Sequence, residues 1–204
     1  MQRLFRVFSF LFHPLLIPSY ATLLYFAATH NFFYKHEIYL IFIQVLILTI
    51  LLPISLFYLL RSFGLLKSRL VNQKERRLPL AIYAILLLIL LRHSLGLLVV
   101  PELYYYFLGC LISIIAALAL AIANIKPSLH VMAVCTLAML PVGLSAYYHI
   151  QFLGLIIFLI LVVGTVATAR LMAGKHALGE VALGALLGVL PQVMLWFIWL
   201  VPTL

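Results

Sequence analysis

The 204-residue chain has very few charged side chains and no aspartate. Only 8% of its residues are charged, 67% are hydrophobic, and the mean hydropathy is +1.28. This composition lies far outside that of soluble globular domains and predicts an integral membrane protein with several helical spans. Linkers, low-complexity tracts and a separate soluble part are also missing from the sequence. We therefore expect a single membrane domain over residues 1–204.

Carboxylates are the scarcest polar groups. Against 13 lysines and arginines, which give a net charge of +9, the only acids are Glu37, Glu75, Glu102 and Glu180. Mg²⁺ and Ca²⁺ need several oxygen ligands, so a carboxylate-based site is hard to build, and we expect no metal and no other cofactor. Cys110 and Cys135 lie inside apolar runs, which favours small buried residues over a disulfide. No nucleic-acid partner is expected.

Seven apolar runs are long enough to cross a bilayer as a helix, which takes about 20 residues. They cover residues 4–29, 38–60, 78–100, 103–124, 130–148, 152–168 and 177–201. Pro14 and Pro18 would kink the first run, and Arg92 and His93 must snorkel outward from the end of the third. We predict an all-α, polytopic membrane helix bundle with six or seven transmembrane helices.

The segments between these runs alternate in charge. Those on the N-terminal side, here called side A, hold 11 of the 13 lysines and arginines, all except Lys35 and Arg92. Side B instead collects aromatic residues at 32–34, 104–106, 147–148, 196 and 199. Basic loops mark the cytoplasmic side, and aromatic residues form belts at membrane interfaces. We expect a bacterial inner (plasma) membrane protein with side A in the cytoplasm.

Polar residues suited to phosphate gather at three places on side A. In the first group, Lys74 and Arg77 can share a helix face next to Pro79, a residue that suits a first helical turn. Most charges of this group are better explained by topology and by contacts with lipid headgroups than by a phosphate site, so only the pair nearest the helix is assigned to phosphate. In the second group, Ser128 suits a helix N-cap ahead of His130, and exposed amides at a helix N-terminus bind anions.

The third group lies between the last two runs. His176 and Glu180 are four residues apart, so a helix that starts near His176 presents both on one face. A carboxylate beside an imidazole fixes its tautomer and raises its basicity, which suits a nucleophile or a proton carrier. Arg170 precedes a turn at Gly174 and can fold back to offer its guanidinium to an anion. The alternative is a helix start with capping and interfacial charges.

A helical hairpin returns the chain from His130 to His176 on the same side of the membrane. Two histidines, one glutamate and several lysines and arginines therefore converge at one end of the bundle. An excess of positive donors without a cluster of metal-binding carboxylates describes a phosphate site.

The order of these groups resembles the type 2 phosphatidic acid phosphatase (PAP2) family, which is related to vanadium haloperoxidases. That family carries Lys-x6-Arg-Pro, then Pro-Ser-Gly-His, then Ser-Arg-x5-His-x3-Asp. The third motif matches as Arg170-x5-His176-x3-Glu180, with alanine for the leading serine and glutamate for aspartate. The second matches at residues 127–130, with leucine in place of glycine.

The first motif is degraded. Leu78 separates Arg77 from Pro79, and Lys74 or Lys67 would have to stand in for the family's lysine. The resemblance covers a PAP2-like core at about residues 67–188. The apolar stretch between the first two motifs is long enough for two spans, which a typical six-span member would not have.

The resemblance implies a role for each matching residue. His176 would attack phosphorus and form a phosphohistidine, Glu180 would support its imidazole, and His130 would protonate the leaving oxygen and then activate water. No metal would be required. The residues that would hold the phosphoryl oxygens are Arg170, Ser128, Lys74 and Arg77.

The expected function is thus hydrolysis of a lipid phosphate or a polyprenyl diphosphate at the membrane. The first alternative is a non-catalytic relative that binds or moves anionic lipid, favoured by the degraded first motif and by Leu129. The second is a small channel or transporter, for which polar residues at mid-membrane depth are few. The identity of the lipid and the oligomeric state do not follow from the sequence.

Overall fold

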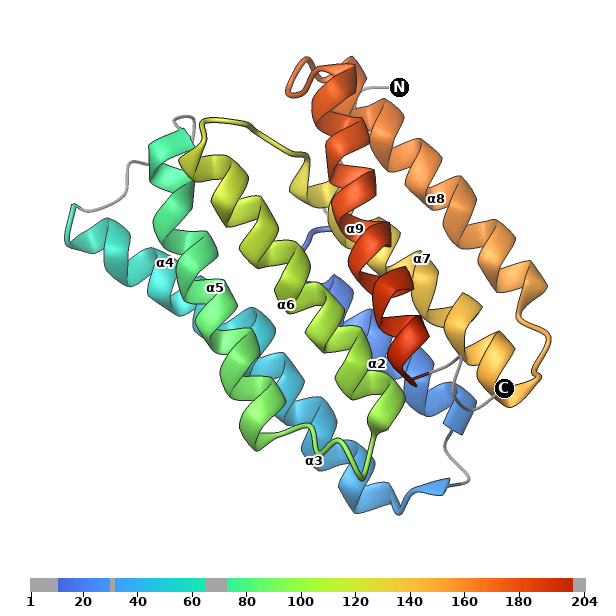
Figure 1. Ribbon diagram of the computed structural model, residues 1–204. Coiled ribbons are helices and arrows are strands. Elements are labelled where there is room, and N and C mark those ends of the chain that lie inside the picture. Colours follow the sequence, from blue (N-terminus) through green and yellow to red (C-terminus); the bar gives the residue numbers. More distant parts are fainter. Residues whose placement is uncertain (1–10, 30–31, 65–72, 200–204) are drawn as a thin grey trace.

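The computed structural model describes residues 11–29, 32–64 and 73–199, with the side chains of residues 73 and 74 left aside. Every regular element of this described part is a helix, so the all-α prediction is confirmed (Figure 1). The elements are α2 (Ile17–Thr29), α3 (Lys35–Leu46), the π-helical η2 (Ile47–Leu51), α4 (Leu52–Ser62), α5 (Gln73–His93), α6 (Pro101–Ile122), α7 (Leu129–Tyr148), α8 (Leu153–Met172) and α9 (Leu178–Trp199).

With α3, η2 and α4 taken as one continuous helix, successive helices run in alternating directions across one bundle (Figure 1). The start of α5, the connection from α6 to α7 and the connection from α8 to α9 all lie at the same end, the upper one in Figure 1. This end carries the groups that the sequence assigns to side A, and side B is the opposite end. Which end faces the cytoplasm stays a prediction.

Five helical segments of the described residues are long and apolar enough to cross a membrane. They are Lys35–Ser62, Pro101–Ile122, Leu129–Tyr148, Leu153–Met172 and Leu178–Trp199. Several apolar helices of this length are compatible with an integral membrane protein, but the predicted count of six or seven spans is not confirmed.

The first of the two remaining runs lies partly outside the described residues, at positions 4–10. Its described helix, α2, has 13 residues and begins at Ile17, with Pro18 in its first turn, where a missing N–H costs least. Helix α5 has 21 residues, but its uncharged middle between Arg77 and Arg92 is shorter than the about 20 residues of a span. Helix α5 begins at Gln73, so Pro79 lies inside the helix and not in its first turn as expected.

The segment Lys35–Ser62 is continuous although its centre is π-helical. Pro53, the second residue of α4, follows η2 after Leu52 and cannot donate a backbone hydrogen bond to the turn before it. A local widening of the helix accommodates that missing bond. The helix thereby keeps its full length along the bundle.

Helices α7 and α9 pack closely because two glycines of α9 face the backbone of α7. A Cβ added to Gly184 would lie 2.6 Å from the carbonyl oxygen of Ser128. One added to Gly188 would collide with the carbonyl oxygen of Met132 and lie 2.7 Å from the Cβ of Cys135. Small residues four apart allow such close helix contacts in membranes. This contact joins the start of α7 to the first turns of α9.

We predict that Gly188→Ala destabilises the protein, whereas Gly164→Ala does not. Nothing lies within 4 Å of a Cβ at Gly164, which is exposed on α8, so alanine there only improves helix propensity. Overpacking at Gly188 costs about 1–3 kcal/mol, or roughly 5 °C in Tm for a chain of this size. Thermal unfolding of both variants in the same detergent measures the difference. Equal Tm values would contradict the close contact.

Candidate functional site

The three polar groups of side A meet where α5, α7 and α9 begin and α8 ends. Their hydrogen bonds and electrostatic contacts, given below, link residues from all of these segments. The described carboxylates of these groups are those of Glu75 and Glu180, among several basic side chains.

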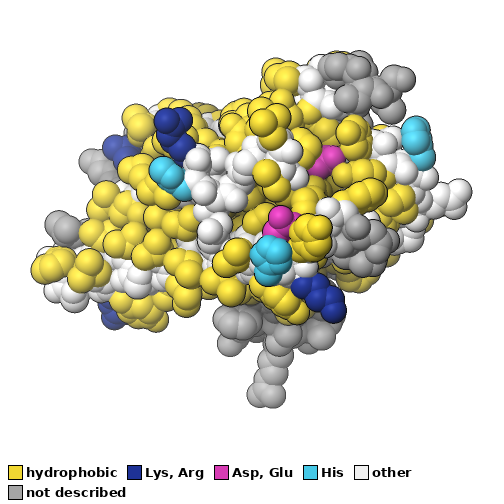
Figure 2. All heavy atoms as spheres, turned by 90° about the horizontal axis from the view of Figure 1, so that it is seen from below, with side chains coloured by type: hydrophobic (Ala, Val, Ile, Leu, Met, Phe, Trp, Pro, Cys, Tyr) yellow, Lys and Arg dark blue, Asp and Glu magenta, His cyan; other side chains and the backbone are white. Residues whose placement is uncertain are grey.

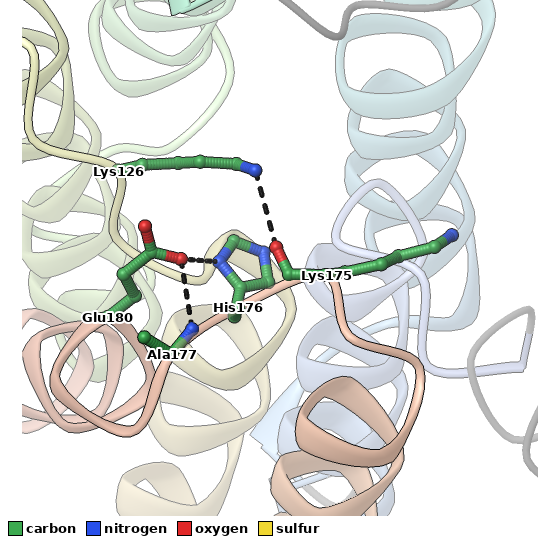
Figure 3. A network of polar contacts seen from close by, with 5 residues as sticks. All are labelled: Lys126, Lys175, His176, Ala177 and Glu180. Carbon is green, nitrogen blue, oxygen red and sulfur yellow. Dashed lines mark hydrogen bonds and ion pairs between the residues drawn. The ribbon is translucent and has the colours of Figure 1, made fainter.

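His176 and Glu180 form a direct side-chain contact. The imidazole Nδ1 of His176 lies 2.7 Å from Oε2 of Glu180, and only 7% of the His176 side chain is exposed (Figure 3). The spacing had suggested that His176 and Glu180 share one helix face. Helix α9 begins at Leu178, however, so His176 precedes the helix and does not lie on its face. The contact is local, between residues four apart at the start of α9, and Gly174, at φ 60°, turns the chain between α8 and α9 just before the pair.

The hydrogen bonds of Glu180 define the tautomer of His176. The backbone N–H of Ala177 also donates to Oε2 of Glu180, at 3.3 Å, as in a helix capping box (Figure 3). An ionised carboxylate only accepts hydrogen bonds, so Nδ1 of His176 carries the proton. The free lone pair is then on Nε2, which is the nitrogen available to an electrophile.

Ser128 is fixed against the first turn of α9. Its backbone N–H donates to the carbonyl oxygen of Glu180 at 2.9 Å. Ser128 is the N-cap residue of α7, as expected, but its hydroxyl makes no capping hydrogen bond. The side chain is fully buried and its Oγ has no partner among the described residues.

Arg170 provides a second buried polar group without a partner. It lies in the last turn of α8, is 7% exposed, and its Nε has no hydrogen-bond acceptor in the described part of the chain. An unpaired buried donor is costly. A bound anion that accepts from Nε of Arg170 and Oγ of Ser128 would remove that cost.

His130 lies in the first turn of α7, close enough to Arg170, Lys175 and His176 for their charges to act on it. A third histidine, His13, packs edge to face against it, with ring centroids 5.3 Å apart. Burial and the charge of Arg170 lower the pKa of His13. The sequence analysis missed His13, because it precedes α2 and no spacing rule connects it to α7.

Two lysines, Lys126 and Lys175, lie near the His176–Glu180 pair without contacting it directly. Lys126 donates from Nζ to the backbone carbonyl oxygen of Lys175 at 3.2 Å, which ties the two connecting segments together (Figure 3). The side chain of Lys175 extends away from the His176–Glu180 pair (Figure 3).

Of the two arginines that open α5, Arg76 is the one that faces the pair. The charge of Arg76 acts on both Glu180 and His176. Arg77 instead donates to the carbonyl oxygens of Ala121 and Ile122 and to Oδ1 of Asn124, each at 3.2 Å. Arg77, which the sequence analysis assigned to phosphate, thus caps the C-terminal end of α6.

The structure does not place the side chain of either lysine proposed for the degraded first motif. Lys74 lies in the first turn of α5, but its side chain is outside the described residues, as is the whole of Lys67. The structure therefore brings together His130, His176, Glu180, Arg170 and Ser128, and adds Arg76 and His13 to them. Across the described residues, no group of three or more histidines, cysteines or acids is placed to hold a metal ion.

Comparisons with family models, with curated proteins and with solved structures find no match to this chain. What the site can do is therefore argued from its own geometry.

We predict opposite shifts of the His176 pKa in two variants. Burial lowers this pKa below its ordinary value, Glu180 raises it, and Lys126 and Arg76 lower it. The imidazole is therefore neutral at pH 7. Glu180→Gln removes the raising contribution, so the pKa falls further; Lys126→Gln removes a lowering one, so it rises. Titration of ¹³C-labelled histidine by NMR measures both, and a rise in Glu180→Gln would contradict the contact.

Proposed function

We propose that the chain is a membrane phosphohydrolase that cleaves a lipid phosphate or a polyprenyl diphosphate through a phosphohistidine on His176. The observation that carries the proposal is the partly buried 2.7 Å contact of His176 with Glu180, beside two unpartnered buried donors, Ser128 Oγ and Arg170 Nε. A site that only binds an anion needs positive charge and has no use for a carboxylate that holds an imidazole in one tautomer.

In the first step, Nε2 of His176 attacks phosphorus while the bond from phosphorus to the leaving oxygen breaks. Glu180 stabilises the positive charge that develops on the imidazole, as a carboxylate does for other catalytic histidines. Arg170 and Ser128 donate to the phosphoryl oxygens as charge builds on them. His130 gives a proton to the leaving oxygen, and the leaving group departs as an alcohol or a phosphate.

In the second step, His130 takes a proton from a water molecule that attacks the phosphohistidine. The bond from Nε2 to phosphorus breaks, inorganic phosphate leaves, and His176 returns to its neutral form with a proton on Nδ1. No oxidation or reduction occurs, and the protons balance because His130 loses one in the first step and regains it in the second.

The resemblance to type 2 phosphatidic acid phosphatases supports the same roles for the matching positions of the second and third motifs, which lie close together, but not for Arg77 of the first motif. The apolar exterior and the position of the site at a helix end favour a substrate whose hydrocarbon tails stay in the bilayer. Glutamate in place of the family's aspartate keeps the contact with the imidazole through a longer side chain.

One observation favours the alternative, a protein that binds or moves anionic lipid without turnover. Arg77, the arginine of the degraded first motif, contacts the C-terminal end of α6 and not the His176–Glu180 pair. The two functions differ in whether phosphate is released.

We predict that the purified protein releases inorganic phosphate from at least one member of a panel of phosphatidate, phosphatidylglycerol phosphate and polyprenyl diphosphates. His176→Ala abolishes release because the nucleophile is lost. His130→Ala accumulates an acid-labile, base-stable phosphoenzyme from a substrate with a good leaving group, because hydrolysis lacks its base. Equal lipid binding by wild type and His176→Ala, with no release from any panel member, would establish the binder instead.

We also predict different defects for Arg76→Met and Arg77→Met. Loss of Arg76 removes a positive charge that acts on the pair, and lowers kcat/KM by about tenfold or more. Loss of Arg77 removes three hydrogen bonds to the end of α6 and mainly lowers Tm. Activity and thermal unfolding, measured on both variants, distinguish the two roles. A larger loss of activity in Arg77→Met would reverse the assignment.

A further inference from the structure

A second polar cluster lies at side B, far from the His176 site. Glu102, in the first turn of α6, is 3% exposed and accepts hydrogen bonds from two tyrosines on other helices. The hydroxyl of Tyr25 on α2 lies 2.9 Å from Oε2, and that of Tyr148 on α7 lies 2.8 Å from Oε1. Three helices thus join at one buried carboxyl group, whose two oxygens both act as acceptors.

No lysine, arginine or histidine of the described residues forms an ion pair with Glu102. The two phenolic donors and the N-terminal end of α6 favour negative charge there. A buried carboxylate without a cation is nevertheless expensive, and the cost falls when a counter-charge lies nearby. The surroundings of Glu102 therefore indicate what kind of cation can approach it.

Glu102 is also one of the residues that line a cavity of about 230 Å³. Its lining residues are Leu97, Pro101, Glu102, Tyr105, Tyr147 and Trp199. The ring of Trp199 stacks on Tyr105, with centroids 6.0 Å apart and an interplanar angle of 11°, and is tilted by 55° against Tyr147 at 5.7 Å. Figure 2 shows this end of the bundle, where hydrophobic side chains predominate and charged ones are scattered.

We propose that this cavity is a binding site for an organic ammonium group, such as a choline or ethanolamine moiety. Aromatic faces attract alkylammonium cations, and cages of several rings recognise quaternary ammonium groups. The Glu102 carboxylate supplies the opposite charge at one wall. An inorganic cation fits poorly, because it would need several oxygen ligands where the cavity offers mostly rings and aliphatic side chains.

An interfacial belt alone does not account for this arrangement. Belt residues need only an apolar ring and a polar edge near the headgroups. Here two tyrosines hold a buried carboxylate in place, and two further tyrosines and a tryptophan enclose the space beside it. The proposal concerns the opposite end of the bundle from His176 and stands whether or not the chain is a phosphohydrolase.

The test uses the intrinsic fluorescence of Trp199. Trp196 and Trp199 are the only tryptophans, so Trp196→Phe leaves a single reporter in the cavity wall. The protein is titrated in a maltoside detergent with choline and, as a control of the same shape without charge, with 3,3-dimethyl-1-butanol. We expect a saturable change of Trp199 emission with choline and none with the neutral alcohol.

Two further variants in the same background separate charge from shape. Glu102→Gln keeps the size of the side chain and weakens choline binding by about tenfold or more, since the counter-charge is lost. Tyr105→Leu leaves the Glu102 hydrogen bonds intact and weakens binding by about two- to fivefold, the contribution of one ring. If Glu102→Gln does not fold, the choline affinity of Tyr105→Leu still tests whether choline binds in the cavity.

Nanodiscs identify the source of the ammonium group. A phosphatidylcholine headgroup in the site makes Trp199 emission in phosphatidylcholine nanodiscs equal to that of the choline-saturated protein. A soluble amine as ligand leaves emission the same in phosphatidylcholine and phosphatidylglycerol nanodiscs, with choline still able to change it; both results support the site. The proposal is overturned by no saturable response to choline, by an equal response to the alcohol, or by unchanged affinity in Glu102→Gln and Tyr105→Leu.

Discussion

The close contact between α7 and α9 is the interaction on which the candidate site depends. Gly184 and Gly188 let the two helix backbones approach, and the amide of Ser128 then reaches the carbonyl oxygen of Glu180. This single bond sets the start of α7 against the first turn of α9. The residues of the second and third motifs, separated by a whole helical hairpin in sequence, come together for that reason.

The chain has few polar groups, and it concentrates them at the two ends of one bundle. At side A the unpartnered donors of Ser128 and Arg170 and the surrounding positive charge suit an anion. At side B the Glu102 carboxylate and its aromatic neighbours suit a cation. In an apolar environment a buried polar or charged group without a partner raises the free energy of the folded state. The positions of these polar groups therefore indicate where a ligand of opposite charge can bind.

Composition was enough to predict an all-helical membrane bundle, and the spacing of His176 and Glu180 was enough to predict their contact. The choice between Arg76 and Arg77 could not be made from the sequence, because the stretch between Arg77 and Arg92 is apolar on every face and gives no periodicity. The approach of His13 to His130 was also out of reach, since it is a tertiary contact between segments with no common motif.

The central claim is that His176 is transiently phosphorylated, and oxygen exchange tests it without knowledge of the lipid. In the reverse of the hydrolytic step, the enzyme forms phosphohistidine from inorganic phosphate and releases water, so oxygen-18-labelled phosphate gradually loses its label to the solvent. ³¹P NMR resolves the labelled species. The account predicts exchange by wild type and none by His176→Ala. Absence of exchange by wild type, or the same rate in both proteins, would contradict it.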